Sequence, residues 1–570
     1  MGAAVPAVDA FPGLRAWQRK ALVDYLRRRG DDFLAVATPG AGKTTFALRV
    51  AAELLADRTV EAVTVVAPTE HLKAQWSQAA ARVGIQLDSA FRNADVHSSA
   101  DFHGAVVTYA QVGMAPQVHR RRTTARPTLV VLDEIHHAGD SRTWGDGIRA
   151  AFEPAVRRLM LTGTPFRSDD NPIPFVTYER GGDGLLRSRA DSVYGYAEAL
   201  RDGVVRPVLF LAYSGETRWR TRAGDELAAR LGEPMTQDLI AQAWRTALDP
   251  SGDWMPQVLR AADARLTVLR EGGMPDAGGL VIASDQQSAR AYARLLERIA
   301  GEKPVVVLSD DAGATARIAA FTASERRWLV AVRMVSEGVD IPRLAVGVYA
   351  TSASTPLYFA QAIGRFVRAC RPGESASVFL PSVPHLLGLA SEMEAERDHV
   401  LGRSERSGFD DELLARASRT EQASDELTKQ FEALSATAEL DQVIFDGASF
   451  GTGAQAGTPE EEEYLGLPGL LTGEQVELLL RRRQADQVAH RRRRTSDQPP
   501  LPAPAPPMTT AQRRITLRRQ LNALVAAHHH RTGLPHGKIH AELRRRCGGP
   551  PSAQATIEQL EERIATVQTL

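Results

Sequence analysis

The segment Ala37–Thr45, which reads Ala-Thr-Pro-Gly-Ala-Gly-Lys-Thr-Thr, constrains the fold of this chain more than any other stretch. An apolar run at residues 33–37 leads into it and a helix-forming segment starts at Phe46, so the sequence predicts a strand, a glycine turn and a helix. Gly40 and Gly42 allow the backbone of such a turn to point successive N–H groups at an anion. The segment therefore predicts a phosphate-binding loop in an α/β fold.

Side chains of the same loop predict how phosphates and a metal are held. The ammonium of Lys43 can face the outer phosphates, and the hydroxyl of Thr44 can ligate Mg²⁺. Ala37 replaces the first glycine of the usual G-x-x-x-x-G-K-[ST] pattern, which leaves the two turn glycines in place. The amide of Gln18, shortly upstream, can pair with an adenine, and an exposed Gln with no ligand is the alternative. The predicted nucleotide contacts are Gln18, Pro39, Gly40, Ala41, Gly42, Lys43, Thr44 and Thr45.

Hydroxyl side chains stand where two further predicted strands end. Thr69 follows a strand at residues 63–67, and Thr108 lies near the end of a strand at residues 105–109. Because ligands bind at the carboxyl ends of strands in a parallel sheet, both hydroxyls are placed to meet a phosphodiester of nucleic acid. The alternative is that both residues only cap helices.

A carboxylate pair follows another fully apolar predicted strand. Asp133 would be costly at the end of a buried strand unless it held a cation, and we assign it to the same Mg²⁺ as Thr44. Glu134 can orient and deprotonate an attacking water. His136 is assigned to coupling between the nucleotide site and the second half of the chain. The Thr-Gly-Thr turn at residues 162–164 is expected to hydrogen-bond this segment.

Strands and helices alternate a second time from residue 204 onward. Apolar strands are predicted at residues 204–212, 280–283, 305–308 and 328–332, and helix-forming segments follow most of them. Two α/β units of similar size in tandem imply parallel sheets with a cleft between the units.

The last segment of this second half, Gln361–Arg368, is predicted to be a helix. Arg365 and Arg368 would then lie three residues apart on one face. Two adjacent guanidinium groups repel each other unless an anion lies between or opposite them. The phosphates bound by the first half are the natural anion, which would make both residues arginine fingers, and an ordinary solvated helix face is the alternative.

Taken in chain order, these segments resemble a superfamily 2 helicase of the DExH type. The Gln-Trp pair at residues 75–76 and the sequence Leu-Thr-Gly-Thr-Pro-Phe-Arg at residues 161–167 are most similar to the branch of XPB-like helicases and restriction-enzyme motor subunits. The resemblance is carried by Gln18, 40–44, 68–69, 75–76, 108–109, Asp133–His136, 162–164, 336–340 and 361–368.

This resemblance implies two RecA-like domains, use of ATP and Mg²⁺, and movement along nucleic acid. It also implies that Gly338 and Asp340 contact the nucleotide or pass its state to the strand. Arg333 stands where a small hydroxyl residue is common in the family, which is a departure from the pattern. The expected division is an ATP-binding domain at 11–205, a second RecA-like domain at 206–385, an accessory region at 386–508 and a small basic helical module at 509–570.

The tail is predicted to be mostly helical. Polar helices are expected from Leu386 to about residue 440, a solvated loop at Glu460–Glu463, an extended linker at Pro499–Pro507 and three short helices after it. We assign a phosphate anchor for nucleic acid to the basic residues of the last module, with a docking site for a partner protein as the alternative. The assigned residues are Arg513, Arg514 and Arg518.

Composition adds limits on location and partners. Basic and acidic residues balance at 69 each, so the net charge does not select a partner. Two cysteines cannot form a disulfide framework, which fits a reducing compartment, and no apolar stretch approaches the roughly 20 residues that span a bilayer. We expect a cytoplasmic protein, in the cytosol or nucleoid of a bacterium, with no membrane partner.

Two functions are consistent with these patterns. The first is an ATP-dependent helicase or translocase that acts on DNA, with RNA as the second choice of substrate. The other is a nucleotide-gated binding or remodelling subunit of a restriction or phage-defence complex that does not unwind nucleic acid.

Overall fold

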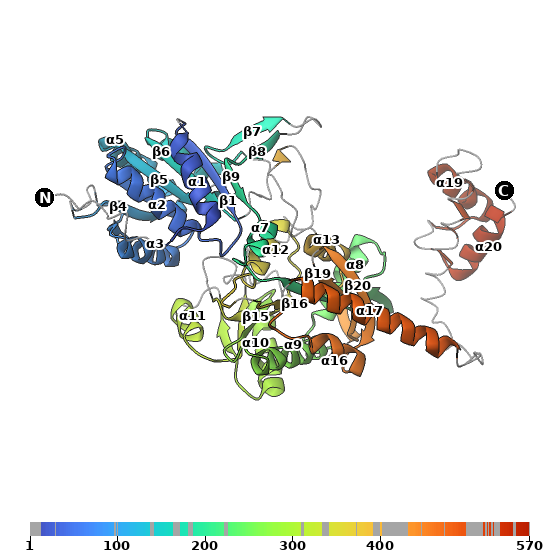
Figure 1. The fold of residues 1–570 in the computed structure, drawn as a ribbon. Helices are drawn as coiled ribbons and strands as arrows, with labels where there is room; N and C mark the ends of the chain where they lie inside the picture. Colours follow the sequence, from blue (N-terminus) through green and yellow to red (C-terminus); the bar gives the residue numbers. More distant parts are fainter. Residues whose placement is uncertain are drawn as a thin grey trace.

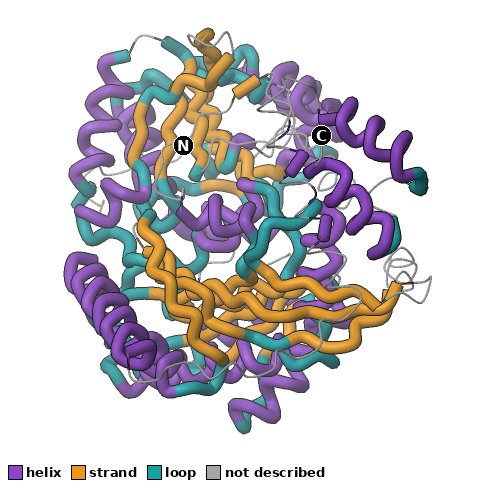
Figure 2. Tube along the Cα trace, turned by 90° about the vertical axis from the view of Figure 1, so that its right-hand side faces the viewer, coloured by secondary structure: helices purple, strands orange, loops and turns teal. Residues whose placement is uncertain are grey.

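The computed structural model describes most of the 570 residues of the chain. The described residues are 13–28, 30–95, 99, 101–136, 142–163, 172–180, 186–221, 226–308, 313–332, 341–371, 373–391, 400–401, 431–445, 447–471, 473–496, 517–518, 521, 524–525, 528, 536–550 and 555–568. Two sheets, each with helices packed against it, form the body of the molecule (Figures 1 and 2).

The first sheet has seven strands, which all run parallel to their neighbours. Its central strands are almost completely buried, as expected for a parallel sheet covered on both faces. In spatial order the strands are β3 (Leu87–Asp88), β4 (Gly104–Thr108), β2 (Ala62–Ala67), β5 (Thr128–Asp133), β6 (Arg157–Thr162), β1 (Asp32–Ala37) and β9 (Ser192–Tyr194).

Helices cover both faces of this sheet. One apolar cluster joins the sheet to the first three helices, and a second cluster joins its other face to the next three. We call this unit the first lobe. Its helices are α1 (Ala16–Arg27), α2 (Lys43–Ala56), α3 (Glu70–Arg82), α4 (Tyr109–Met114), α5 (Pro116–Ala125), α6 (Arg142–Phe152) and α7 (Tyr196–Arg201).

The second sheet is mixed. Six strands run parallel, and two strands from later in the chain are added antiparallel at one edge. The order is β13 (Val305–Val307), β14 (Trp328–Val332), β12 (Gly278–Ala283), β15 (Leu344–Ala350), β16 (Ala376–Pro381), β10 (Val208–Thr221), β19 (Glu439–Phe445) and β20 (Ala448–Gln455). The second half of β10 also pairs antiparallel with β11 (Glu226–Leu231) and β18 (Phe431–Ala436).

We call the unit built on this sheet the second lobe. Its helices are α8 (Gln237–Ala247), α9 (Trp254–Glu271), α10 (Gln286–Ala300), α11 (Ala314–Thr322), α12 (Pro356–Ile363), α13 (Pro384–Ser391), α16 (Pro459–Leu465) and α17 (Gly473–Ser496). Arg265 of α9 is fully buried and donates to the carbonyls of Leu465 and Leu467, which fastens the end of α16 to the lobe.

Two predictions for the tail are wrong. Residues expected as polar helix near position 435 form strand β18 instead. The acidic run Glu460–Glu463 lies in α16 and is not a solvated loop. Glu461 is only 3% exposed. Its burial is tolerated because its carboxylate accepts hydrogen bonds from the hydroxyl of Tyr213 and the backbone N–H of Gly457. Tertiary partners more than 200 residues away in sequence therefore decide the structure of this stretch.

The remaining described elements are small. A sheet of three strands consists of β17 (Val400–Leu401), β8 (Leu186–Arg189) and β7 (Thr177–Arg180). Helices α19 (His536–Cys547) and α20 (Ile557–Gln568) pack around an apolar cluster of their own and stand apart from the sheets (Figure 1). Among the described helices, none has both the length and the apolar composition to cross a bilayer. The predicted α/β class, with two tandem parallel-sheet lobes and a helical C-terminal region, is confirmed.

Candidate functional site

The loop between β1 and α2, residues 37–45, adopts the conformation that its glycines predict. Gly40 and Gly42 have φ angles of +80° and +91°, which a residue with a side chain adopts only with strain. Helix α2 begins at Lys43, so its first N–H groups, which have no intrahelical acceptor, lie at the end of the loop. We refer to these residues as the phosphate loop, since this geometry favours an anion.

Three side chains at the start of α1 stabilise the phosphate loop. Each donates a hydrogen bond to one loop carbonyl, at distances of 2.9 to 3.1 Å. The pairs are Arg15 with Gly40, Trp17 with Ala41, and Gln18 with Gly42. Sequence reasoning missed the first two, and their only signal was proximity to Gln18.

The amide of Gln18 is engaged at both ends in this structure. Its Nε2 donates to the Gly42 carbonyl at 2.9 Å, and its Oε1 accepts from the backbone N–H of Arg15 at 2.8 Å. The side chain is buried, so the alternative of an exposed Gln is wrong. Its contact with an adenine stays a prediction.

Glu134 and Lys43 form an ion pair at the mouth of the loop. Lys43 Nζ lies 2.8 Å from Glu134 Oε1, and the backbone N–H of Gly163 donates to Glu134 Oε2 at 3.1 Å. Burial raises the pKa of Glu134, but Lys43 and His136 outweigh it and lower the pKa below its usual range. Glu134 is therefore a charged carboxylate, its side chain is 29% exposed, and its role as a general base stays a prediction.

Asp133 is buried beside this pair. Trp76 Nε1 donates to its Oδ2 at 2.8 Å, and the hydroxyl of Tyr109 donates to its backbone carbonyl at 2.8 Å. Burial and the neighbouring Glu134 raise the pKa of Asp133, which favours a cation as its partner. The assignment of Mg²⁺ to Asp133 and Thr44 stays a prediction. Both side chains supply oxygen ligands of the kind that Mg²⁺ binds, and the ion completes its shell with phosphate and water.

His136 is buried and connects three parts of the structure. Its Nδ1 lies 3.0 Å from Thr162 Oγ1, and its Nε2 lies 3.3 Å from the amide nitrogen of Gln361 in the second lobe. One imidazole ring therefore joins Thr162 of the first lobe to Gln361 of the second. The expected bonds between the Asp133–His136 segment and the turn after β6 are present at Thr162 and Gly163, whereas Thr164 lies outside the described residues.

The segment that follows α12 contacts the phosphate loop. A Cβ placed on Gly364 would lie 2.9 Å from Pro39 Cγ, and a Cβ placed on Gly40 would lie 3.8 Å from Arg368 Cβ. We call Gly364–Arg368 the arginine segment. Burial lowers the pKa of Arg368, and nearby Arg15 lowers it further. Positive charge from both lobes therefore accumulates beside the loop, which favours an anion there.

The prediction that residues 361–368 form one helix is wrong. Helix α12 ends at Ile363, a turn follows, and Arg368 forms an isolated antiparallel bridge with Val205. The chain leaves the helix because the carbonyls of Phe366 and Val367 accept hydrogen bonds from Arg206. Arg365 and Arg368 still belong to the segment at the phosphate loop, but they do not share a helix face.

Thr69 and Thr108 act as helix N-caps, as the alternative reading predicted. Thr69 Oγ1 accepts from the N–H of Leu72 at 3.4 Å, and Thr108 Oγ1 accepts from the N–H of Gln111 at 3.1 Å. Thr108 is the last residue of β4, and Thr69 follows β2, the neighbouring strand of the first sheet. Contact with nucleic acid stays a prediction for both. Arg518 is half-buried, and the assigned residues outside the described part of the chain are Gly338, Asp340, Arg513 and Arg514.

Comparisons with known proteins found relatives of the first lobe and of the chain as a whole. Residues 12–167 match the family model described as "Type III restriction enzyme, res subunit". The chain is 61% identical to uncharacterized protein Rv2917 of Mycobacterium tuberculosis (strain ATCC 25618 / H37Rv) over 98% of this chain and 93% of that protein. It is 59% identical to uncharacterized protein ML1624 of Mycobacterium leprae (strain TN) over 99% and 94%.

One solved structure similar to this chain is a fragment of a putative HsdR subunit of a type I restriction enzyme from Vibrio vulnificus YJ016. The match has a TM-score of 0.45 and 16% identity, and it covers 68% of this chain and 67% of that chain.

Proposed function

The chain belongs to the same family as the mycobacterial proteins Rv2917 and ML1624, and its first lobe matches the model of a restriction enzyme subunit. From that premise we propose that it is a superfamily 2 protein, an ATP-dependent nucleic-acid helicase or translocase. We place DNA ahead of RNA as the substrate, because the family model that matches the first lobe is that of a restriction enzyme subunit. Hydrolysis of ATP between the two lobes would drive the movement of a strand.

The observation that carries this proposal is the set of contacts between the lobes at the phosphate loop. Gly364 faces Pro39, Arg368 faces Gly40, and Gln361 lies within 3.3 Å of His136. A cleft with a phosphate loop on one wall and arginines on the other changes its width when a triphosphate enters or leaves. An ATP-driven motor needs such a change in the width of its cleft.

Residues of the phosphate loop and of β5 would bind different parts of ATP and its metal ion. Gly40 and Gly42 would offer backbone N–H groups to the phosphates, whereas the N–H of Ala41 donates to the Thr38 carbonyl at 3.1 Å in this structure. Thr44 with Asp133 would hold Mg²⁺. When bound, this ion neutralises charge that develops on the phosphate oxygens.

Hydrolysis would begin with a change of partner at Lys43. The phosphates compete with Glu134 for the ammonium, so that Glu134 is released to accept a proton from the attacking water. Arg365 and Arg368 would stabilise the charge on the transferred phosphoryl group from the opposite lobe. His136 would report the state of the site to Gln361.

Movement along nucleic acid follows if each lobe holds the backbone of the strand. Thr69 and Thr108 lie at the carboxyl ends of neighbouring strands of the first sheet, where they would meet the backbone of the nucleic acid. Gly338 and Asp340 of the second lobe would contact the nucleotide or pass its state to the bound strand. Closing and opening of the cleft would then step the lobes along the strand without reading its sequence.

The test is ATP turnover measured in parallel with single-stranded DNA, duplex DNA and RNA. We expect stimulation by DNA, and we expect Glu134→Gln to lower turnover by about 10²- to 10⁴-fold because the general base is lost. Glu153→Gln is the matched control, since this carboxylate lies on the surface of the same lobe with 74% of its side chain exposed. Turnover that no nucleic acid stimulates would refute the proposal.

A second candidate function is a nucleotide-gated binding or remodelling subunit of a restriction or phage-defence complex. The match to a restriction enzyme subunit favours it. Strand displacement separates the candidates. Turnover stimulated by DNA without displacement of an annealed strand or of a blocking triplex strand would favour the second one.

A further inference from the structure

A buried ion pair lies directly behind the arginine segment. The side chains of Arg206 and Glu374 are 1% and 3% exposed, and Arg206 Nη1 lies 3.2 Å from Glu374 Oε2. Arg206 follows α7 in the linker that enters β10, and Glu374 precedes β16. Neither residue was singled out by its sequence context, and neither contacts the phosphate loop in the contacts described above.

Arg206 binds the arginine segment at two successive carbonyls. Its Nε donates to the carbonyl of Phe366 at 2.7 Å, and its backbone N–H donates to the carbonyl of Val367 at 2.7 Å. The preceding residue, Val205, forms the antiparallel bridge with Arg368. The path of the backbone that leads to Arg368 is thus set by the linker between the lobes.

Glu374 binds the chain just after the arginine segment. Its Oε2 accepts from the backbone N–H of Cys370 at 2.9 Å as well as from Arg206. The remaining nitrogen of Arg206, Nη2, donates to the carbonyl of Leu344 at the start of β15. The pair therefore ties residues 366–370 both to the linker and to the second sheet.

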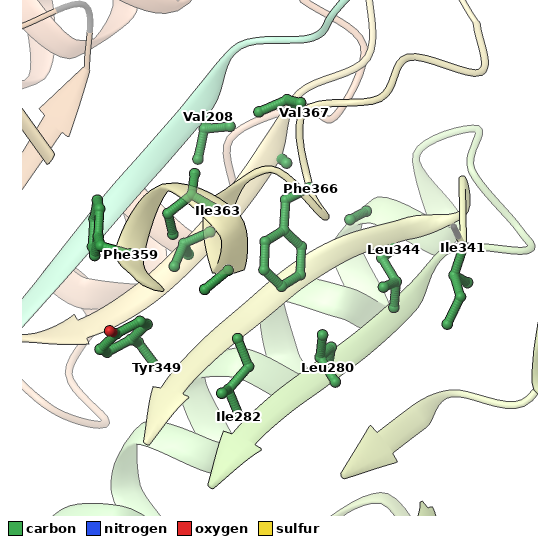
Figure 3. Close-up of a cluster of buried hydrophobic side chains, with 14 of the residues drawn as sticks. Val208, Leu280, Ile282, Ile341, Leu344, Tyr349, Phe359, Ile363, Phe366 and Val367 are labelled. Carbon is green, nitrogen blue, oxygen red and sulfur yellow. The ribbon is translucent and has the colours of Figure 1, made fainter. Parts of the chain in front are cut away.

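Apolar packing also holds the arginine segment against the second sheet. Figure 3 shows Ile363 and Phe366 over the strands of the second sheet, and Val367 beside Val208 at the start of β10. A Cβ placed on Gly347 of β15 would lie 2.5 Å from the ring of Phe366, so this ring occupies the space that the glycine leaves open.

Stability alone gives a weak reason for such a pair. Burying two charges costs desolvation that their attraction barely offsets, and apolar residues of similar size often serve stability as well. The pair does fix the geometry of its surroundings, since a planar guanidinium with fixed donors places three acceptors relative to one another. Tyr196, the first residue of α7, also donates to the backbone carbonyl of Arg206 at 3.0 Å, which extends this network toward the first lobe.

We propose that Arg206 and Glu374 are positioning residues that hold the arginine segment against the phosphate loop. They set the rate of turnover through Arg368 and leave the affinity for nucleotide largely unchanged. This inference rests on the proposed function, because it gives the segment a role in hydrolysis.

The first test compares Arg206→Lys and Glu374→Gln with the wild-type protein. Lysine cannot reach all the acceptors of the guanidinium, and glutamine keeps the shape of glutamate without its charge. A displacement of about 1 Å at the reacting groups lowers kcat by roughly 10²-fold, and we expect a loss of that order with KM little changed. A loss confined to KM would overturn the inference.

Arg265→Lys is the matched control. Arg265 is equally buried in the second lobe, but its described hydrogen bonds go to the hydroxyl of Ser377 and to the carbonyls of Leu465 and Leu467, and none goes to the arginine segment. We expect its substitution to lower the melting temperature without a selective loss of kcat. If this control lowered kcat as much as Arg206→Lys at equal stability, a general effect of buried arginines would explain both.

A double substitution separates positioning from a general weakening of the fold. In an Arg368→Ala background, Arg206→Lys should cost little further kcat if it acts through Arg368. Losses that multiply would overturn the inference and leave the proposed function standing.

Hydrogen exchange supplies a readout that does not need activity. In Glu374→Gln a neutral amide oxygen replaces the charged acceptor of the backbone N–H of Cys370, so this hydrogen bond weakens and exchange of that N–H should rise by about tenfold. Exchange in residues 366–370 should also rise in Arg206→Lys and stay unchanged in Arg265→Lys. Unchanged exchange in all three variants would overturn the inference, whereas an inactive wild-type protein would overturn only the proposed function.

Discussion

The phosphate loop and the arginine segment are in contact, yet they are built in different ways. The loop takes its shape from residues close in sequence, since Gly40 and Gly42 supply the positive φ angles and α2 begins at the next residue. The side chains that bind its carbonyls, Arg15, Trp17 and Gln18, lie only 24 or 25 positions from their acceptors. The arginine segment takes its shape from distant residues. Arg206 lies 160 positions from Phe366, whose carbonyl it binds.

This difference matters for how each region responds to change. A loop encoded by contiguous residues fails when one of those residues is replaced. A segment held by several distant contacts can fail at any of them, and the same contacts allow motion elsewhere in the molecule to move it. The arginine segment is thus the more sensitive point of control, and three substitutions or truncations test this comparison.

The largest effect is expected for Arg368→Ala. Arginines that contact a transferred phosphoryl group contribute roughly 10³- to 10⁵-fold to turnover, so we expect kcat to fall by about 10³-fold. Nucleotide affinity should change far less, because the phosphate loop keeps its own contacts. Steady-state turnover combined with binding of a fluorescent ATP analogue measures both.

Arg371→Ala is the control for this substitution. Arg371 carries the same charge three positions later, its side chain is 48% exposed, and its Nη1 donates to the carbonyl of Gly273. Its removal should leave turnover near the wild-type value. Equal losses in the two variants would show that net charge, and not contact with the phosphates, is what the segment supplies.

The loop illustrates what the sequence could predict. Apolar runs before Gly40 and after Thr44 identified β1 and α2, and the position of Asp133 at the end of a strand was also clear. These features are local, so hydrophobic periodicity and glycine positions determine them. The two α/β lobes followed from the same alternation of strands and helices, whereas the order of the strands within each sheet was not predicted.

The arginine segment and the tail illustrate what it could not predict. The pattern of Gln361–Arg368 suits a helix, but the acceptors of Arg206 lie in a turn, and nothing near Arg206 in sequence indicates them. The acidic run after Thr458 looks solvated, yet Glu461 is buried against Tyr213. Both errors have one cause, which is that a tertiary partner overrode a local pattern.

A smaller effect is expected when the two regions are pushed apart. In Gly364→Ala the new Cβ would lie 2.9 Å from Pro39 Cγ and 3.1 Å from the carbonyl of Ala360, so the lobes must separate slightly. The φ angle of Gly364 is −53°, which alanine adopts freely, so the contact alone is tested. We expect kcat to fall by about tenfold, since small misplacements of reacting groups are costly.

Gly388→Ala in α13 is the matched control for this change, because a Cβ there would meet nothing within 4 Å. Alanine in a helix is favoured over glycine by about 0.5–1 kcal/mol, so this variant should be as stable as the wild type or more so, with the same kcat. A Gly364→Ala variant that retained full turnover would show that the contact with Pro39 is not needed in the working state.

The smallest effect on turnover is expected from removal of the tail after Ser496. Helices α19 and α20 have an apolar cluster of their own, so a chain that ends at Ser496 should keep the melting temperature and basal turnover of the whole protein. Only its affinity for DNA should change, with the salt slope falling by about one unit for each phosphate contact that is lost.

A chain that ends at Leu470 provides the contrast. It lacks α17, whose Val476 and Leu480 are buried against the second lobe, and exposing side chains of this size costs about 1.5–3 kcal/mol each. Thermal unfolding and DNA binding over a range of salt concentrations compare the two chains. If the chain ending at Ser496 lost stability or basal turnover, the last helices would be part of the motor, because a separate anchor can alter only the grip on DNA. An unchanged salt slope would instead move the anchor from the last module to the basic residues that remain, such as Arg481 on the exposed face of α17.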